Sequence, residues 1–166
     1  MQPLEPDEER ESLIRQSPKA REAMDLFRQG YNCAQAVLVA FCKDLGLDEQ
    51  QALMLSSSFG GGIGRMREVC GAVSGMAMAA GLARGYTDPR ASSEKAAHYE
   101  RIQKMANKFR EKNGSIVCRE LLGLTRLGPD SPVPEERTAD YYKKRPCDIL
   151  VGQCAAILEQ ELGKRD

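Results

Sequence analysis

The sequence predicts an all-α fold, a compact bundle of about six to seven helices. Apolar residues recur at the three- and four-residue spacing of a helix along most of the chain. No alternating pattern of the kind that indicates strands stands out, and no internal repeat is present. Residues that cap and stop helices divide the chain into segments of ordinary helical length. The 166 residues are enough for one domain with a self-sufficient core.

Capping residues mark the start of most of the predicted helices. The predicted helices begin at or near Ser17, Asn32, Asp48, Val69, Asp88, Ser115 and Pro146. At two of these starts the cap is followed directly by proline, which is typical of a first helical turn. Glycines end several of the helices, including Gly30, Gly46 and Gly114.

Two segments are expected to differ from the helical body. Residues 1–16 are acidic and contain prolines, which indicates a flexible N-terminal arm before a single helical domain at 17–166. Residues 124–139 are rich in proline, glycine and charge. We therefore predict an extended surface connection there, between the last two helices of the domain.

Two helices are predicted to lie at the centre. The helix that follows Asn32 is apolar nearly all round, so we expect it to be buried on several sides. In the helix that ends at Arg84, Gly71, Gly75 and Ala79 lie four residues apart. Small residues at this spacing make a smooth face on which a second helix can pack closely. The same face could also serve a homo-oligomer.

The charge of the chain limits its partners. It has 24 basic and 24 acidic residues, so no basic field attracts nucleic acid or an acidic membrane. The beginning of the chain lacks the apolar region of a signal peptide, and no apolar run is long enough to cross a bilayer. We therefore expect a cytoplasmic protein with no nucleic-acid partner and no transmembrane segment.

Cysteine is the residue type in this chain with the greatest capacity for chemical reaction. The six cysteines are Cys33, Cys42, Cys70, Cys118, Cys147 and Cys154. All except Cys42 and Cys154 fall in the first turn of a predicted helix, where unpaired N–H groups and the helix dipole favour the thiolate. Cys70 also follows a glycine-rich loop directly. Cys42 and Cys154 fall in helix interiors and are expected to be core residues.

The spacing of the four helix-start cysteines leaves three interpretations open. No C-x-x-C pair is present, so neither a thioredoxin-type motif nor a zinc ribbon is indicated. Thiols brought together by the fold could exchange disulfides, or could ligate a soft metal or an iron–sulfur cluster. The third interpretation is a structural helical adaptor in which every cysteine is a core residue.

A glycine-rich loop precedes Cys70, with glycine at Gly60, Gly61, Gly62 and Gly64. It lacks the Gly-Lys-Ser/Thr of a P-loop and the third glycine of a dinucleotide fingerprint. We expect either a tight turn or a loop whose backbone N–H groups approach an anion, a cofactor or a thiolate. The arginines of this loop, at 65 and 67, are expected to be solvated.

The segment Cys70–Gly75, with sequence Cys-Gly-Ala-Val-Ser-Gly, resembles the core of the C_GCAxxG_C_C family of redox-active proteins, whose members are small and helical. The resemblance continues in Asn32–Val37, in Phe59–Gly62, in Cys118–Gly123 and around Cys147, so it covers about residues 30–158. It implies that Cys33, Cys70, Cys118 and Cys147 are the functional cysteines. These are the four that lie at predicted helix starts.

Residues and resemblance together lead to one main hypothesis. The four cysteines converge near the glycine loop and carry out thiol–disulfide exchange or electron transfer with a redox partner that the sequence does not identify. Cys70 is expected to be the leading nucleophile, and Cys33 is its first-choice disulfide partner. Cys118 and Cys147 are resolving thiols. In the alternative, the same four cysteines are ligands of a soft metal or an iron–sulfur cluster, without turnover.

Overall fold

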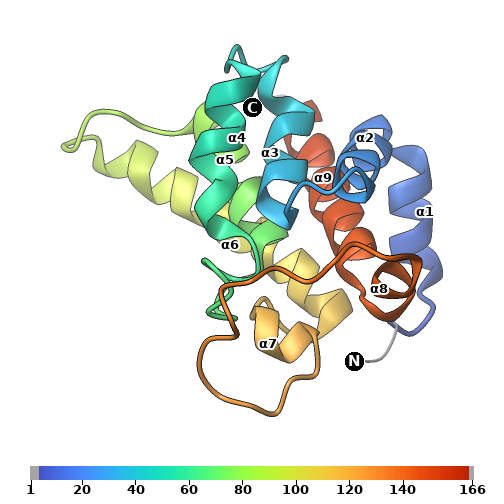
Figure 1. The fold of residues 1–166 in the computed structure, drawn as a ribbon. Coiled ribbons are helices and arrows are strands. Elements are labelled where there is room, and N and C mark those ends of the chain that lie inside the picture. The colour runs from blue at the N-terminus through green and yellow to red at the C-terminus, as the bar shows by residue number, and fades with distance from the viewer. Residues whose placement is uncertain (1–3, 165–166) are drawn as a thin grey trace.

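The structure is a computed structural model that describes residues 4–164 of the chain. Within this range it contains nine α-helices and a single 3₁₀ turn (Figure 1). Their bounds are α1 Glu8–Gln16, α2 Pro18–Arg28, α3 Cys33–Cys42, α4 Glu49–Ser56, η1 Ser57–Phe59, α5 Gly71–Arg84, α6 Ser92–Asn113, α7 Cys118–Leu121, α8 Ala139–Lys144 and α9 Cys147–Gly163. The all-α prediction is confirmed, and α1 and α8 bring the count above the predicted six to seven.

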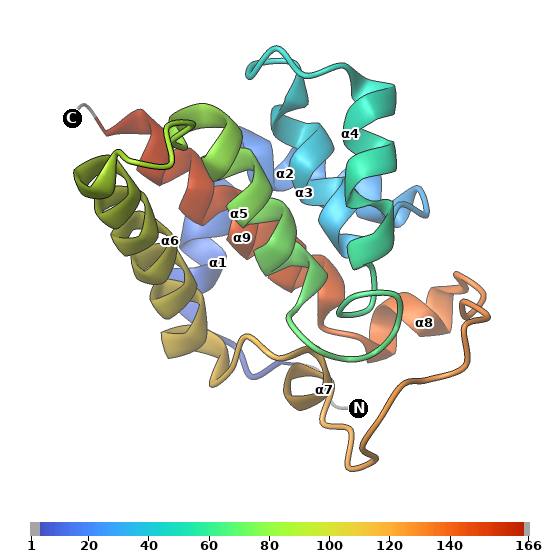
Figure 2. The same cartoon turned by 90° about the vertical axis from the view of Figure 1, so that its left-hand side faces the viewer.

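Helix α9 runs through the middle of the bundle (Figure 2). It packs against α1, α2, α3, α5 and α6. Its residues from 147 to 158 are all buried except two near the start, which matches their apolar character. Helix α3 is also enclosed, by α2, α4, α5 and α9, as its nearly all-round apolar sequence predicts.

The small-residue face of α5 packs on α3. A Cβ atom at Gly75 would lie 2.7 Å from the carbonyl oxygen of Ala34, and one at Gly71 would lie 3.1 Å from Cβ of Cys33. The two backbones can approach this closely only because neither position has a side chain. The predicted close partner of this face is therefore α3, and the contact brings the starts of the two helices together.

The prediction of a flexible arm at 1–16 is wrong for residues 8–16. These residues form α1 and pack on α2 and α9. The Asp7 side chain accepts a hydrogen bond from the Arg10 N–H at 2.8 Å and so caps the helix. Acidic residues in the first turn complement the helix dipole, and Leu13 packs against the core. The acidic composition that suggested disorder is thus partly a helix-start signal. Residues 1–3 lie outside the described range.

One end of the bundle collects the loop at 60–68, α7 and α8 (Figures 1 and 2). The segment from 122 to 138, between α7 and α8, has no helix or strand and crosses this end of the bundle (Figure 2). A single antiparallel bridge, Val69 with Val117, is the sole β-type pairing within residues 4–164. No helix in that range is both long and apolar enough to cross a bilayer.

Candidate functional site

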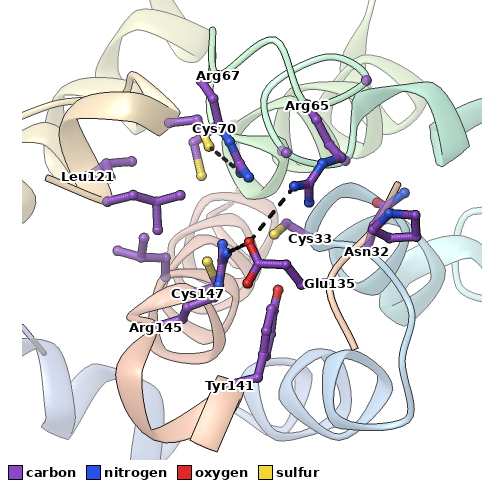
Figure 3. Close-up of a pocket in the computed structure, with 18 of the residues that line it drawn as sticks. Asn32, Cys33, Arg65, Arg67, Cys70, Leu121, Glu135, Tyr141, Arg145 and Cys147 are labelled. Atoms are coloured by element: carbon purple, nitrogen blue, oxygen red, sulfur yellow. Dashed lines mark hydrogen bonds and ion pairs between the residues drawn. The ribbon is translucent and has the colours of Figure 1, made fainter. Parts of the chain in front are cut away.

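The four helix-start cysteines line one cavity of about 420 Å³ at this end of the bundle (Figure 3). Cys33, Cys118 and Cys147 are the first residues of α3, α7 and α9, and Cys70 is the N-cap of α5. The predicted placement at helix starts therefore holds for all four. Neither of the two remaining cysteines lines the cavity.

A capping box fixes the start of α3 and the position of Cys33. The Asn32 side chain accepts from the N–H groups of Ala34 and Gln35, and the Gln35 side chain accepts from the Asn32 N–H. The Asn32 amide also donates to the Ser57 carbonyl at 3.1 Å. This last bond attaches the start of α3 to the segment that leads into the glycine loop.

The isolated bridge holds Cys70 beside Cys118. The Cys70 N–H donates to the Ile116 carbonyl at 2.8 Å, and the Cys118 N–H donates to the Glu68 carbonyl at 2.6 Å. Cys70 and Cys118 each lie one residue from the bridging valines, so they are diagonal neighbours on one face of the pairing. The backbone therefore groups these two thiols although 48 positions separate them in the sequence.

Cys33 and Cys147 form the second pair. Hydrogen bonding with the Cys33 thiol lowers the pKa of Cys147, and the same interaction raises that of Cys33 well above 9.0. Burial opposes the lowering at Cys147, while the positive charges of Arg145, Arg137 and Arg67 favour it. Of the four cavity thiols, Cys147 is the one whose environment favours the thiolate.

Burial dominates at the other pair. It raises the pKa of Cys70 to about 12, and the N–H groups of Val73 and Ala72 at the start of α5 offset only part of this effect. Burial also raises the pKa of Cys118, although a hydrogen bond from Arg67 opposes it. The expectation that a helix start makes Cys70 the readiest thiolate is therefore wrong in direction, because desolvation outweighs the helix terminus.

The glycine loop is a left-handed turn. Backbone φ is positive at Gly61, Gly62 and Gly64, and also at Ile63 and at the arginines 65 and 67. The N–H groups of residues 63–68 donate to carbonyls of residues 58–63, so they are directed into the loop. A Cβ at Gly62 would lie 2.8 Å from Cβ of Cys118, which shows why glycine is needed there. Gly60, Gly61 and Gly64 line the cavity, whereas Gly62 supports Cys118 from behind.

Three non-glycine residues in this conformation are sterically unfavourable, and two of them, Arg65 and Arg67, line the cavity. Arg67 is 3% exposed, so the expectation of a solvated arginine is wrong. It donates to Asp130 through Nε at 2.7 Å and lies 3.7 Å from the Cys118 sulfur through a terminal nitrogen. Arg65 donates to the Ser131 carbonyl at 2.7 Å.

The segment from 122 to 138 forms a wall of the cavity. The Asp130 N–H donates to the Arg65 carbonyl at 3.1 Å, which joins this segment to the glycine loop. Further along, Glu135 forms ion pairs with Arg65, at 3.8 Å, and with Arg145 (Figure 3). The predicted extended connection is thus attached at its middle, through Asp130, and nearer its end, through Glu135, which itself lines the cavity.

Two further arginines stand over aromatic rings. The Arg137 guanidinium lies 4.5 Å from the ring centre of Phe27 and 4.7 Å from that of Tyr141. The Arg145 guanidinium lies 4.6 Å from the same Tyr141 ring. Burial raises the pKa of Tyr141 to about 12, so its ring is neutral at physiological pH. Each contact helps to fix a cation at the cavity wall.

Residues 31–161 match the family model described as "Putative redox-active protein (C_GCAxxG_C_C)". The match covers most of the chain and includes all four cavity cysteines. The chain belongs to the C_GCAxxG_C_C family. No curated protein and no solved structure is significantly similar to it.

The core motif of the C_GCAxxG_C_C family has a packing explanation in this member. Its two glycines are Gly71 and Gly75, where any side chain would collide with α3 or with the carbonyl of Phe59. The cysteine before them caps α5 and faces the cavity. The motif thus combines one thiol with the helix contact that brings it near a second thiol, Cys33.

The donor set does not fit a metal as arranged. Among residues 4–164, no three His, Cys, Asp or Glu side chains are grouped so as to hold one metal ion. The four cysteines of this C_GCAxxG_C_C protein are instead arranged as two pairs, Cys33 with Cys147 and Cys70 with Cys118, and a backbone bridge joins the second pair. We therefore derive no chemistry through a metal or an iron–sulfur cluster.

Sequence reasoning missed the residues that act on Cys147 electrostatically, above all Arg137 and Arg145. Arg137 lies in the segment that the sequence analysis interprets only as a surface connection, and Arg145 follows it, directly after α8. One signal was present, since the pair Tyr141–Tyr142 stands between these two arginines in the sequence and aromatic rings are common partners of guanidinium groups.

Replacing Asp130 with asparagine is expected to destabilise the fold by roughly 1–3 kcal/mol near neutral pH, because buried Arg67 loses its charged partner. A hydrogen bond from Arg67 lowers the pKa of Asp130 below 3.8. The pair therefore stabilises the fold above pH 3.8, and its contribution disappears as the pH falls through the lowered pKa. Urea unfolding at neutral and acidic pH measures this.

The matched control for this prediction is Asp140→Asn, which removes an exposed carboxylate from α8 and should change the free energy of unfolding by less than about 0.5 kcal/mol. Equal effects of the two substitutions at neutral pH, or an Asp130 effect that persists in acid, would contradict the assigned role of the pair.

Proposed function

We propose that this C_GCAxxG_C_C protein carries out thiol–disulfide exchange, with Cys147 as the attacking thiolate and Cys33 as the resolving thiol. The observation that carries the proposal is the meeting of Cys33 and Cys147 in one arginine-lined cavity, where the pKa of Cys147 is lowered. A thiolate held next to a second thiol is the arrangement that such exchange requires. Cys33 is partly exposed and Cys147 borders the cavity, so a disulfide can reach both.

The proposed reaction consumes a disulfide and oxidises two thiols. The Cys147 thiolate attacks one sulfur of the substrate disulfide, forming a mixed disulfide and releasing the other sulfur as a thiolate. Cys33 then loses its proton to the released thiolate and attacks the Cys147 sulfur. This second step releases the remaining half of the substrate as a thiolate and leaves a Cys33–Cys147 disulfide. Two electrons pass from the protein to the substrate, which becomes two thiols.

Cys70 and Cys118 are proposed as a second dithiol behind the first. Attack by Cys118 on the Cys33–Cys147 disulfide, followed by attack of Cys70 on the Cys118 sulfur, would transfer the oxidation inward and regenerate the first pair. The raised pKa values of Cys70 and Cys118 suit thiols that act second rather than first. Arg67, 3.7 Å from the Cys118 sulfur, would stabilise the thiolate needed for that attack.

Disulfide mapping after mild oxidation tests the proposal. Reduced protein is treated with one equivalent of a small disulfide, quenched by alkylation and digested for mass spectrometry. The bond that forms first, in samples quenched early, should join Cys33 and Cys147, and a Cys70–Cys118 bond should appear only later, while Cys42 and Cys154 stay thiols because both are buried away from the cavity. Six unchanged thiols, or a first-formed bond that excludes Cys147, would contradict the proposal.

Removal of the Cys33 thiol is expected to raise the pKa of Cys147, because the hydrogen-bond donor that stabilises the thiolate is lost. The pH dependence of Cys147 alkylation by iodoacetamide, followed by peptide mass spectrometry, measures this pKa. In the wild type it should fall below 9.0. Cys33→Ala should shift it upward, and Cys33→Ser, which keeps a donor, should shift it less. A pKa that is the same in all three proteins would rule out the hydrogen bond as its cause.

A further inference from the structure

Arg137 is the cavity arginine without a negative partner. Among the described residues, no carboxylate lies within ion-pairing distance of its guanidinium, and one terminal nitrogen, Nη1, is buried without a hydrogen-bond acceptor. Its other terminal nitrogen donates a long bond, 3.4 Å, to the Tyr31 carbonyl. A buried guanidinium N–H group without an acceptor is costly, so a native protein that keeps one usually supplies an acceptor from elsewhere.

The other arginines of the cavity are each already paired with a carboxylate. Arg67 pairs with Asp130 at 2.6 Å, Arg145 pairs with Glu135, and Arg65 lies 3.8 Å from each of those two carboxylates. Their charges therefore belong to the framework that holds the wall in place.

The position of Arg137 is fixed by rings rather than by acids. Its guanidinium lies against Phe27, Tyr141 and Tyr142, with distances to the ring centres of 4.5, 4.7 and 5.9 Å. Aromatic contacts of this kind orient the planar fork without taking up its N–H donors, and a planar anion is the ligand that such a fork binds in two-point fashion. Arg137 lines the same cavity as the reacting thiols Cys33 and Cys147, so an anion bound by Arg137 would share that cavity with them.

We propose that the cavity binds a low-molecular-weight disulfide that carries a carboxylate, and that Arg137 is the residue that anchors this carboxylate. The inference rests on the proposed function, since it names the substrate class for the same site. The cavity of about 420 Å³ is in the range that takes a small molecule. Its lining includes apolar side chains, such as Leu121 and Leu122, suited to the methylene groups beside a disulfide.

The first experiment compares three disulfides that differ in charge. Dithiodipropionate is anionic, hydroxyethyl disulfide is neutral and cystamine is cationic. The second-order rate constant for loss of each disulfide is measured with reduced protein at fixed ionic strength and near neutral pH. The anionic disulfide should react fastest, and Arg137→Met should reduce its advantage over the neutral disulfide roughly 10- to 100-fold. Arg137→Lys, which keeps the charge but loses the planar fork, should fall between the two.

A matched variant distinguishes loss of the carboxylate anchor from loss of one positive charge. Arg126→Met removes an exposed arginine from the same wall segment, and Arg126 does not line the cavity. It should leave the preference for the anionic disulfide unchanged. If Arg137→Met instead slows all three disulfides equally, Arg137 acts only on the Cys147 thiolate and the proposed substrate class is wrong. An absence of preference in the wild type would also overturn it, as would reaction with protein disulfides alone.

The second experiment does not depend on redox chemistry. Thiodipropionate has the same two carboxylates but a thioether in place of the disulfide, so it can bind without reacting. Calorimetric titration should detect its binding to the wild type and to Arg126→Met, and binding should weaken about 10-fold or more in Arg137→Met. Unchanged binding in Arg137→Met would refute the anchor. Binding that depends on Arg137, in a protein that consumes no disulfide, would keep the anion site and reject the proposed function instead.

Discussion

Replacing Cys147 with serine should abolish disulfide exchange, lowering the rate constant by at least about 100-fold, because a serine hydroxyl does not become the anion that attacks a disulfide near neutral pH. Serine fits the position, and it can still accept the hydrogen bond that Cys33 donates. The fold should therefore be retained. The measurement is the rate at which reduced protein consumes a small disulfide, with circular dichroism and urea unfolding recorded on the same samples.

Cys42→Ser is the matched control for the Cys147 substitution. Cys42 is buried at the end of α3, away from the cavity, so its loss should leave the exchange rate unchanged even if the fold is weakened. Cys70→Ser distinguishes the proposed order, in which Cys147 attacks first, from the sequence-based expectation that Cys70 does. If Cys70→Ser abolishes the first exchange step and Cys147→Ser does not, the proposed order of the thiols is wrong.

Replacing Gly75 with alanine should destabilise the fold by roughly 2–3 kcal/mol, since the new methyl group would lie 2.7 Å from the Ala34 carbonyl oxygen and 3.1 Å from Cβ of Val37. The nearest obstacle is backbone, which cannot turn aside as a flexible side chain can. Helix α5 must move away from α3, and this motion separates Cys70 from Cys33. Urea unfolding measures the loss of stability, and the disulfide-exchange rate reports the displaced thiols.

Gly81 offers a control in the same helix. A Cβ at Gly81 would meet nothing nearer than the His98 ring nitrogen at 3.9 Å. Gly81→Ala should therefore stabilise the protein by about 0.5–1 kcal/mol, through helix propensity alone. A similar loss of stability in both variants would mean that alanine is unfavourable in α5 generally, and the steric explanation for the second glycine of the motif would then fail.

Features that depend on neighbours in the sequence were predictable. Asn32 and Gln35 are three residues apart, so the cap that sets the start of α3, and with it the place of Cys33, can be recognised from the sequence. The spacing of Gly71 and Gly75 likewise predicts a close helix contact. Both signals are local, because they depend on backbone groups within one turn or on one face of one helix.

Features that depend on distant partners could not be predicted in the same way. Arg67 is buried because Asp130, 63 positions away, provides its counter-charge. The difference between the two thiols Cys70 and Cys147 arises from how much water each has lost and from which arginines reach it, and neither quantity follows from helix position. Composition also misled at α1, where acidic residues stabilise a helix start instead of indicating disorder.

Cys33 and Cys147, the two thiols proposed to react first, lie far apart in the sequence, at the starts of α3 and α9. A covalent link between them would close a loop comprising most of the chain and would remove conformational entropy worth about 4–5 kcal/mol from the unfolded ensemble. Folding and oxidation would then be thermodynamically linked, so that the oxidised form resists heat and proteases while the reduced form is the more easily degraded of the two. The lifetime of the molecule would in this way depend on the electron balance of its surroundings.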